Sequence, residues 1–106
     1  MPKYLIQATY TSEGIEGLVR DSASGRRHDV QAAVKKVGGT MEAFYYTFGS
    51  EDVMTIVDLP DNVAAAAVAL ATSGSGLVRV RTTPLLTVEE IDQALELQPP
   101  YRPPGS

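Results

Sequence analysis

The chain has 106 residues, a net charge of −4 and no cysteine. This length supports one domain with a modest core, and a negative charge without a long basic cluster argues against a nucleic-acid partner. The lack of cysteine excludes disulfides and zinc–thiolate sites and fits a reducing compartment. No apolar run has the length of a signal peptide core or a membrane span, so we expect a cytoplasmic protein without a membrane partner.

The first third of the chain predicts a strand followed by a helical region. Lys3–Tyr10 alternates and is rich in strand formers, which is typical of a β-strand. Thr11 or Ser12 then offers a helix N-cap, and apolar residues keep helical spacing as far as Val37, where a Gly-Gly pair ends the helix. Small residues around Gly25 allow either one kinked helix or two shorter ones.

Arg26 is notable because its helical phase puts it inside the apolar stripe, between Ala23 and Val30. A guanidinium group in that position needs an anionic partner. The partner is either a structural carboxylate such as Asp58, which we favour, or a bound ligand. His28, the single histidine, falls on the opposite, solvated face of the helix, and this argues against a catalytic role for it.

The centre of the chain predicts a β-hairpin. Two runs rich in aromatic and β-branched residues, within Glu42–Pro60, flank the polar loop Gly49–Asp52. Strict alternation groups Met41, Ala43 and Tyr45 on one face of the first hairpin strand, and Phe44, Tyr46 and Phe48 on the other. Both faces of the hairpin are largely apolar. We therefore expect the open face of the sheet to be covered by the sheet of a second copy or by a helix from a neighbour.

A second helix–strand unit follows the hairpin. The helix expected from Asn62 to Thr72 contains VAAAAVALA and has almost no polar face, so we expect it to be covered on most sides, with oligomer contact supplying part of the cover. Leu77–Thr83 then predicts a strand, and Pro84 is expected to lead out of the sheet. In that strand Val78 and Val80 share one face, and Arg79 and Arg81 share the other.

The C-terminal part predicts a short amphipathic helix and a tail. Thr87 and Glu90 have the spacing of a capping box, and the helix is expected to end near Leu97. Its apolar positions, Val88, Ile91, Ala94 and Leu95, are expected to face inward. The Pro-rich segment 98–106 is expected to be a disordered tail, with a docking peptide as the less favoured alternative.

The predicted order of elements is β-α-β-β-α-β followed by a terminal helix. This order describes an α+β, ferredoxin-like sandwich in which both helices lie on one face of an antiparallel sheet. We expect residues 1–97 to form this domain. The apolar sheet faces and the Ala-rich helix together favour a homo-oligomer, a dimer or larger.

Several stretches in order along residues 1–95 resemble the GYD-domain family. They are MPKYLIQATYTSEGIEGL, the RR pair, GGTMEAFYYTFG, GSEDV, VDLPDN and VRVRTTPLLTVEEID. The resemblance implies a small bacterial or archaeal domain of the ferredoxin-like, dimeric α/β-barrel type, without an assigned chemistry. Gly49 and Asp52 match the Gly-Tyr-Asp pattern that names the family, and Glu51 stands at the position of its tyrosine.

The candidate ligand site is a pocket between the sheet and the helices, where this architecture commonly binds small molecules. Its expected polar lining is Arg26 with Gln7 or Thr9, Tyr45 or Tyr46, and Arg79 or Arg81. Arginine and a tyrosine hydroxyl in an apolar pocket suit a small carboxylate or a phenol-like compound. For Arg79 and Arg81 we favour a different placement, toward solvent or a subunit interface from an edge strand.

The sequence predicts no metal site and no cofactor. Glu51 and Asp52 are adjacent carboxylates without a nearby histidine or third ligand, and Asp52 is interpreted as a turn residue that bonds its own backbone. There is no phosphate loop and no Ser-His-Asp arrangement, so no catalytic residue is assigned.

Three functions remain open. The favoured one is an oligomeric domain that binds or senses a small molecule. The second is a cofactor-independent enzyme of the monooxygenase, isomerase or cyclase type, which rests on analogy between folds. The third is a structural protein whose apolar surfaces mediate assembly.

Overall fold

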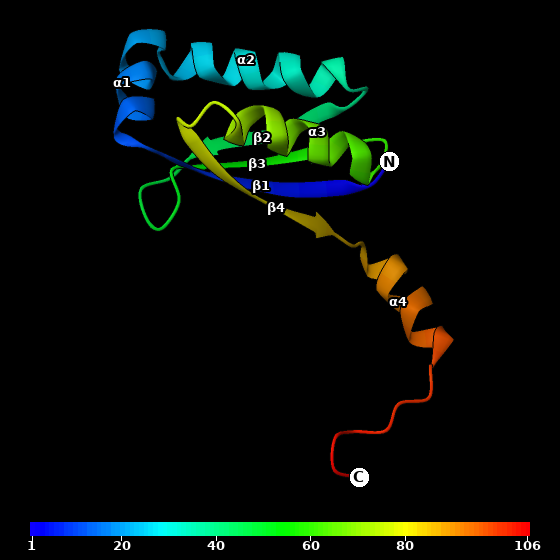
Figure 1. Ribbon diagram of the computed structural model, residues 1–106. Helices are drawn as coiled ribbons and strands as arrows, with labels where there is room; N and C mark the ends of the chain where they lie inside the picture. Colours follow the sequence, from blue (N-terminus) through cyan, green and yellow to red (C-terminus); the bar gives the residue numbers. More distant parts are fainter.

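The computed structural model describes residues 1–106 and contains one four-stranded sheet and four helices (Figure 1). The strands are β1 (Lys3–Tyr10), β2 (Thr40–Tyr46), β3 (Val53–Asp58) and β4 (Val78–Leu85), and the helices are α1 (Ser12–Asp21), α2 (Ala23–Lys36), α3 (Asn62–Ser73) and α4 (Val88–Leu97). All neighbouring strands are antiparallel, in the order β2-β3-β1-β4. The predicted α+β, ferredoxin-like fold is confirmed. None of the helices is both long and apolar enough to cross a bilayer.

One face of the sheet is covered by helices, with α2 packed over β2 and α3 over β4 (Figure 1). The alternation predicted for β1 and β3 decides which side chains meet these helices, because every second residue of both strands is buried. The core between the layers consists of Tyr4, Ile6, Val34, Val57, Leu59, Ala64, Ala65 and Val68. We call the other side, away from α2 and α3, the open face.

The helical region after β1 is divided at Ser22. This residue has a positive φ of 74°, and its side chain accepts a hydrogen bond from the Gly25 backbone N–H at 3.1 Å. Ser22 therefore ends α1 and caps the start of α2. Of the two alternatives that the sequence allows, the structure has two shorter helices.

Strand β2 departs from strict alternation through a β-bulge at Glu42. Met41 lies opposite Val57, whereas Ala43 lies opposite Ile56, so the register shifts between them. Met41 consequently packs against the core and shares the helix-facing side with Phe44 and Tyr46. The prediction that grouped Met41 with Ala43 and Tyr45 is wrong, and Phe48 lies beyond the end of β2.

Two further elements differ from expectation. Pro84 lies inside β4, opposite Tyr4, and does not lead out of the sheet. An edge strand tolerates proline because one of its sides needs no backbone donor. Helix α3 buries Ala64, Ala65 and Val68, while Val63 and Leu70 on its outer side are exposed. Cover for that outer side would have to come from outside the chain.

Helix α4 follows β4 directly and leaves the domain on the side of the open face (Figure 1). The predicted capping box is confirmed: the Glu90 N–H donates to Thr87 Oγ1 at 3.1 Å, and the Thr87 N–H donates to Glu90 Oε1 at 2.8 Å. No residue of α4 is buried, so the prediction that Ile91, Leu95 and their neighbours face inward is wrong for the single chain. The tail after Leu97 has no regular secondary structure.

Candidate functional site

The sheet separates the predicted site residues into two groups. Because β1 alternates, Gln7 and Thr9 lie on the open face, and their partners across the β1–β4 ladder are Arg81 and Arg79. Tyr45 lies on the same face. Arg26 and Tyr46 lie on the other side of the sheet, next to the helices. The seven predicted residues do not line one pocket.

On the helix side, a slot lies between α2 and α3 above the middle of the sheet. Its cavity volume is about 50 Å³, and the whole hollow, open solvent included, takes in about 480 Å³. Its apolar lining is Ile6, Ala8, Val30, Phe44, Val53, Val68, Val78 and Val80, and its polar lining is Tyr10, Arg26, Thr55 and Thr72. The slot exists because α2 covers the β2 side of the sheet and α3 covers the β4 side, with small or β-branched residues on the floor between them.

Arg26 is the one charged residue of the slot. Its side chain is 28% exposed, which agrees with the predicted position within the inner stripe of the helix. Nη1 lies 3.1 Å from Asp29 Oδ2 and 3.7 Å from Asp21 Oδ2, and both of those carboxylates are exposed. The predicted pairing with Asp58 is wrong. A guanidinium has five N–H donors, and Arg26 uses its side chain for a single hydrogen bond, to Asp29.

Asp58 is instead paired with Lys3 on the open face. Lys3 Nζ donates to Asp58 Oδ1 at 2.9 Å and to Glu42 Oε2 at 3.2 Å. The hydrogen bond to Asp58 and the further one to Glu42 raise the pKa of Lys3 above its usual value. Asp58 is thus satisfied on the side of the sheet opposite Arg26, which explains why the two residues cannot meet.

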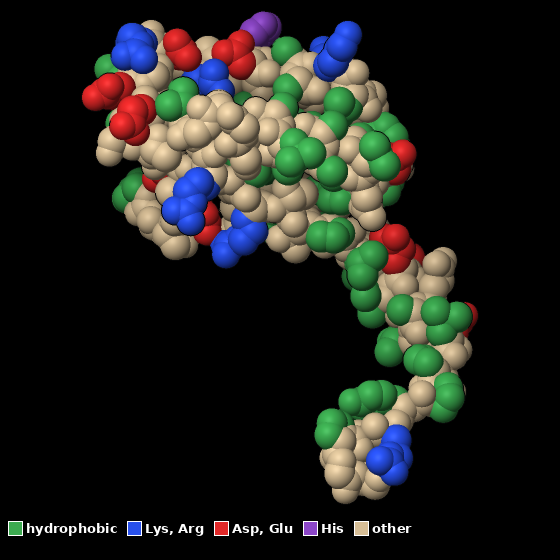
Figure 2. All heavy atoms as spheres, in the orientation of Figure 1, with side chains coloured by type: hydrophobic (Ala, Val, Ile, Leu, Met, Phe, Trp, Pro, Cys, Tyr) green, Lys and Arg blue, Asp and Glu red, His purple; other side chains and the backbone are tan.

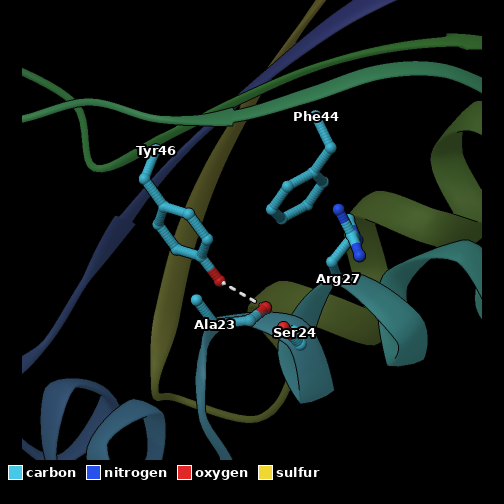
Figure 3. Close-up of a pocket in the computed structure, with 5 residues that line it drawn as sticks. All are labelled: Ala23, Ser24, Arg27, Phe44 and Tyr46. Carbon is cyan, nitrogen blue, oxygen red and sulfur yellow. Dashed lines mark hydrogen bonds between the residues drawn. The ribbon is translucent and has the colours of Figure 1, made fainter.

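Tyr46 and Phe44 form one wall of a smaller notch beside the slot (Figure 3). Their rings meet edge to face with centroids 5.4 Å apart, and Ala23, Ser24 and Arg27 close the notch from α2. The Tyr46 hydroxyl donates to the Ala23 carbonyl oxygen at 3.2 Å and so joins β2 to the first turn of α2. Burial raises the pKa of Tyr46 to about 12, with a further contribution from Tyr10. The phenol is therefore protonated at neutral pH and acts as a donor.

The slot continues toward a groove under α1. Tyr10, Arg26 and Val78 line both hollows, and Gly14 and Gly17 of α1 lie on the far side of the groove. Arg26 therefore stands at the boundary between an apolar interior and a more open, polar entrance. Three residues of the slot were not predicted as site residues: Tyr10, Thr55 and Thr72. The alternation of β1, which places Tyr10 on the same face as Ile6 and Ala8, was the signal for the first of them.

The open face carries a separate polar cluster near the hairpin loop. Arg81 Nη2 donates to Glu51 Oε1 at 2.5 Å, and Thr9 Oγ1 donates to Glu51 Oε2 at 3.1 Å. The neighbouring Asp52 accepts a hydrogen bond from the Tyr10 N–H at 2.9 Å, so the interpretation that Asp52 bonds its own backbone is wrong. These contacts attach the hairpin loop to β1 and β4. Glu51 and Asp52 therefore both have a structural role in this chain.

The fold and the slot together define a ferredoxin-like α+β domain with a hollow between its helical layer and its sheet. The sequence matches the GYD domain family over residues 4–95, and the chain belongs to that family. The family resemblance seen in the sequence motifs is thereby confirmed. No curated protein matches the sequence.

Proposed function

We propose that the protein is a binding or sensing domain for a small, mainly apolar molecule that carries a carboxylate or a phenolic hydroxyl. The observation that carries this proposal is the slot between α2 and α3, in which apolar walls converge on the half-buried Arg26. Pockets of this kind, apolar with a few placed polar groups, are the usual sites for small ligands.

The polar groups of the slot suit an anionic or phenolic head group. The guanidinium of Arg26 can form paired hydrogen bonds to a carboxylate. Its present partners, Asp21 and Asp29, are exposed, so each ion pair contributes only about 0–1 kcal/mol and is readily exchanged for a ligand carboxylate. Thr55 and Thr72 donate their hydroxyls to the backbone carbonyls of Ala43, at 2.7 Å, and Val68, at 2.9 Å, so toward a ligand they offer oxygens that can accept a hydrogen bond, such as one from a phenol.

The raised pKa of Tyr46 favours a binding function over a catalytic one. A tyrosine that acts as a general base needs a lowered pKa, whereas burial raises the pKa of Tyr46 to about 12. His28 lies exposed on the outer face of α2, as its phase predicted, and does not reach the slot. The slot therefore supplies the Arg26 guanidinium as a donor together with apolar contact, and neither Tyr46 in the neighbouring notch nor His28 provides a base for proton abstraction.

The proposal is tested by thermal unfolding with a panel of small aromatic and aliphatic carboxylates and phenols, each paired with an uncharged analogue of the same shape. A ligand present at 100 times its Kd stabilises the folded state by about 2.7 kcal/mol, which gives an easily measured rise in Tm. We expect a carboxylate or phenol to raise Tm more than its uncharged analogue does.

Variants locate the binding. Arg26→Ala should remove the preference for the carboxylate, and the matched change Arg20→Ala on α1 should preserve it. In two-dimensional NMR spectra the ligand should shift the amide signals of Thr55 and Thr72, in the slot, and leave those of Gln7 and Thr9, on the open face, unchanged. If no compound stabilises the protein, or if Arg26→Ala responds like the wild type, the proposed function is wrong.

A further inference from the structure

The groove under α1 carries charges of both signs. It has a cavity volume of about 190 Å³ and continues into the slot, with Arg26 at the boundary. Asp21, the last residue of α1, also lines the groove, and its Oδ2 lies 3.7 Å from Arg26 Nη1. Figure 2 shows both acidic and basic side chains around α1 and the start of α2. The groove therefore presents an anionic and a cationic group to the same small volume.

Both charges are placed against the electrostatics of their own helices. The C-terminus of a helix carries a partial negative charge and the N-terminus a partial positive charge. Asp21 lies at the C-terminus of α1, and Arg26 lies in the first turn of α2. Each helix would be more stable with a charge of the opposite sign at that position. Departures from local rules are typical of functional sites, and here they concentrate negative potential next to positive potential.

The two carboxylates that pair with Arg26 differ in where they lie. Asp29 accepts a hydrogen bond from Arg26 at 3.1 Å, but it lines neither the groove nor the slot. Asp21 lines the groove, and its contact with Arg26 is an ion pair without a hydrogen bond. Arg26 is therefore held mainly by Asp29, and the Asp21 carboxylate keeps its acceptor capacity for a cation in the groove.

The balance of charge around Arg26 favours a ligand that carries both signs. Its ion pairs contain two negative charges and one positive charge. A plain carboxylate that approaches Arg26 adds a third negative charge and competes with both aspartates. A molecule with an ammonium group beside its carboxylate brings no net charge, and the ammonium group gives Asp21 a partner in place of Arg26.

The slot limits the size of the apolar part of the ligand. Its cavity volume is about 50 Å³, which at ~10–15 Å³ for each water-sized group holds roughly four such groups. A branched aliphatic side chain of about three or four carbons fills this volume. The groove, with about 190 Å³, is larger and more polar, so it is the part of the hollow that suits the charged head group.

We propose that the ligand is a free α-amino acid with a short aliphatic side chain, such as leucine or valine. This inference rests on the proposed function and specifies the head group. The ligand carboxylate binds the guanidinium of Arg26, its ammonium group binds the carboxylate of Asp21, and its side chain enters the slot between α2 and α3. The two charged groups of an α-amino acid are attached to one carbon atom, which matches protein groups as close together as Arg26 and Asp21.

The test compares three compounds with the same branched chain by isothermal titration calorimetry on the full chain. Leucine carries both charges, isocaproate lacks the ammonium group, and isoamylamine lacks the carboxylate. For the wild type we expect leucine to bind about tenfold more tightly than either of the others, because each of them loses one charge-assisted contact.

Asp21→Asn should change the affinities for leucine and isocaproate in different directions. The variant lacks the partner of the ammonium group, so leucine should bind about tenfold more weakly. It also lacks a negative charge beside Arg26, so isocaproate should bind at least as tightly as to the wild type. A general disturbance of the fold would weaken the binding of both compounds.

The matched control is Asp29→Asn. This change removes the other carboxylate that pairs with Arg26, at a position outside both hollows. The variant should keep the preference for leucine over isocaproate.

A second variant tests the position of the ligand in the groove. Gly17 lines the groove, and a Cβ at this position meets nothing within 4 Å. Leucine is a better helix former than glycine, so Gly17→Leu should fill the groove without a loss of helix stability and should abolish the binding of leucine. Val19→Leu, at an exposed position of α1 that lines neither hollow, should bind leucine like the wild type.

Several outcomes overturn this inference and leave the proposed function in place. They are equal binding of isocaproate and leucine by the wild type, an equal loss of both in Asp21→Asn, and unchanged binding of leucine by Gly17→Leu. The inference alone is also wrong if none of the three compounds binds while another carboxylate or a phenol does. If no carboxylate or phenol binds, or if Arg26→Ala responds like the wild type, the proposed function is wrong as well.

Discussion

Arg81 and Glu51 are in direct contact across the open face, with 2.5 Å between Nη2 and Oε1, although they are 30 positions apart in the sequence. The Glu51 side chain is largely buried at 17% exposed, and its second oxygen accepts the hydroxyl of Thr9. One carboxylate therefore joins the hairpin loop to β1 and β4. Glu51 thus holds the loop through a charge-assisted hydrogen bond from Arg81 and a hydrogen bond from Thr9.

We predict that Glu51→Gln lowers the free energy of unfolding by about 1 kcal/mol, because the amide keeps the shape of the side chain and loses its charge. Urea denaturation at one fixed protein concentration measures the change. Glu16→Gln on the exposed side of α1 removes the same charge without a side-chain partner and should stay within about 0.5 kcal/mol of the wild type. Equal effects of the two changes would mean that the Glu51 contacts contribute nothing.

Tyr46 should make the protein less stable at alkaline pH. An unfolded tyrosine loses its proton near pH ~10, whereas the folded protein retains the proton of Tyr46 up to about 12. The contribution of Tyr46 protonation to the free energy of unfolding is therefore fully present below pH ~10 and is lost as the pH rises from there toward 12. In Tyr46→Phe this part of the pH dependence should disappear, as measured by urea unfolding at about pH 9 and about pH 11.5.

Lys3 has a raised pKa as well, so Tyr46→Phe should keep a smaller alkaline loss of stability. The variant also lacks the hydrogen bond to the Ala23 carbonyl, which lowers its stability at neutral pH by about 1 kcal/mol. An alkaline slope identical to that of the wild type would show that Tyr46 titrates normally in the folded state.

Substitution by alanine at two glycines of α1 should change the stability of the protein in opposite directions. A Cβ at Gly14 would collide with the Leu77 carbonyl oxygen, which already accepts the Thr11 N–H at 3.0 Å, so Gly14→Ala should cost about 1–3 kcal/mol. A Cβ at Gly17 meets nothing within 4 Å, so Gly17→Ala should stabilise the helix by about 0.5–1 kcal/mol. Thermal unfolding of both variants measures the difference, and a stabilised Gly14→Ala would contradict the close packing of α1 on the turn before β4.

The parts of the fold that follow from local periodicity were predictable from the sequence. The bounds of β1, Lys3–Tyr10, agree with the structure, because alternation and strand-forming residues extend over the whole segment. The inward phase of Arg26 and the capping box at Thr87 were equally accessible, since each depends on residues within one or two helical turns.

The site was less predictable because it depends on how strands pair. Gln7 and Arg26 are both polar residues on predicted elements, yet they lie on opposite sides of the sheet. Because of the bulge at Glu42, the side chains that precede it in β2 lie on the face opposite to the one that strict alternation predicts. Alternation in the sequence alone does not reveal a bulge. The pairing of Arg81 with Glu51 likewise requires the register between distant strands.

The exposure of α4 has a spectroscopic consequence. Isolated helices shorter than about 12–15 residues are marginal in water, and α4 has ten residues with only its capping box to hold its first turn. Without a contact to another surface, α4 would be non-helical in a large fraction of the molecules. If α4 docks on a second copy, the helix content of the whole protein should depend on concentration, so far-ultraviolet circular dichroism would report on assembly without any label.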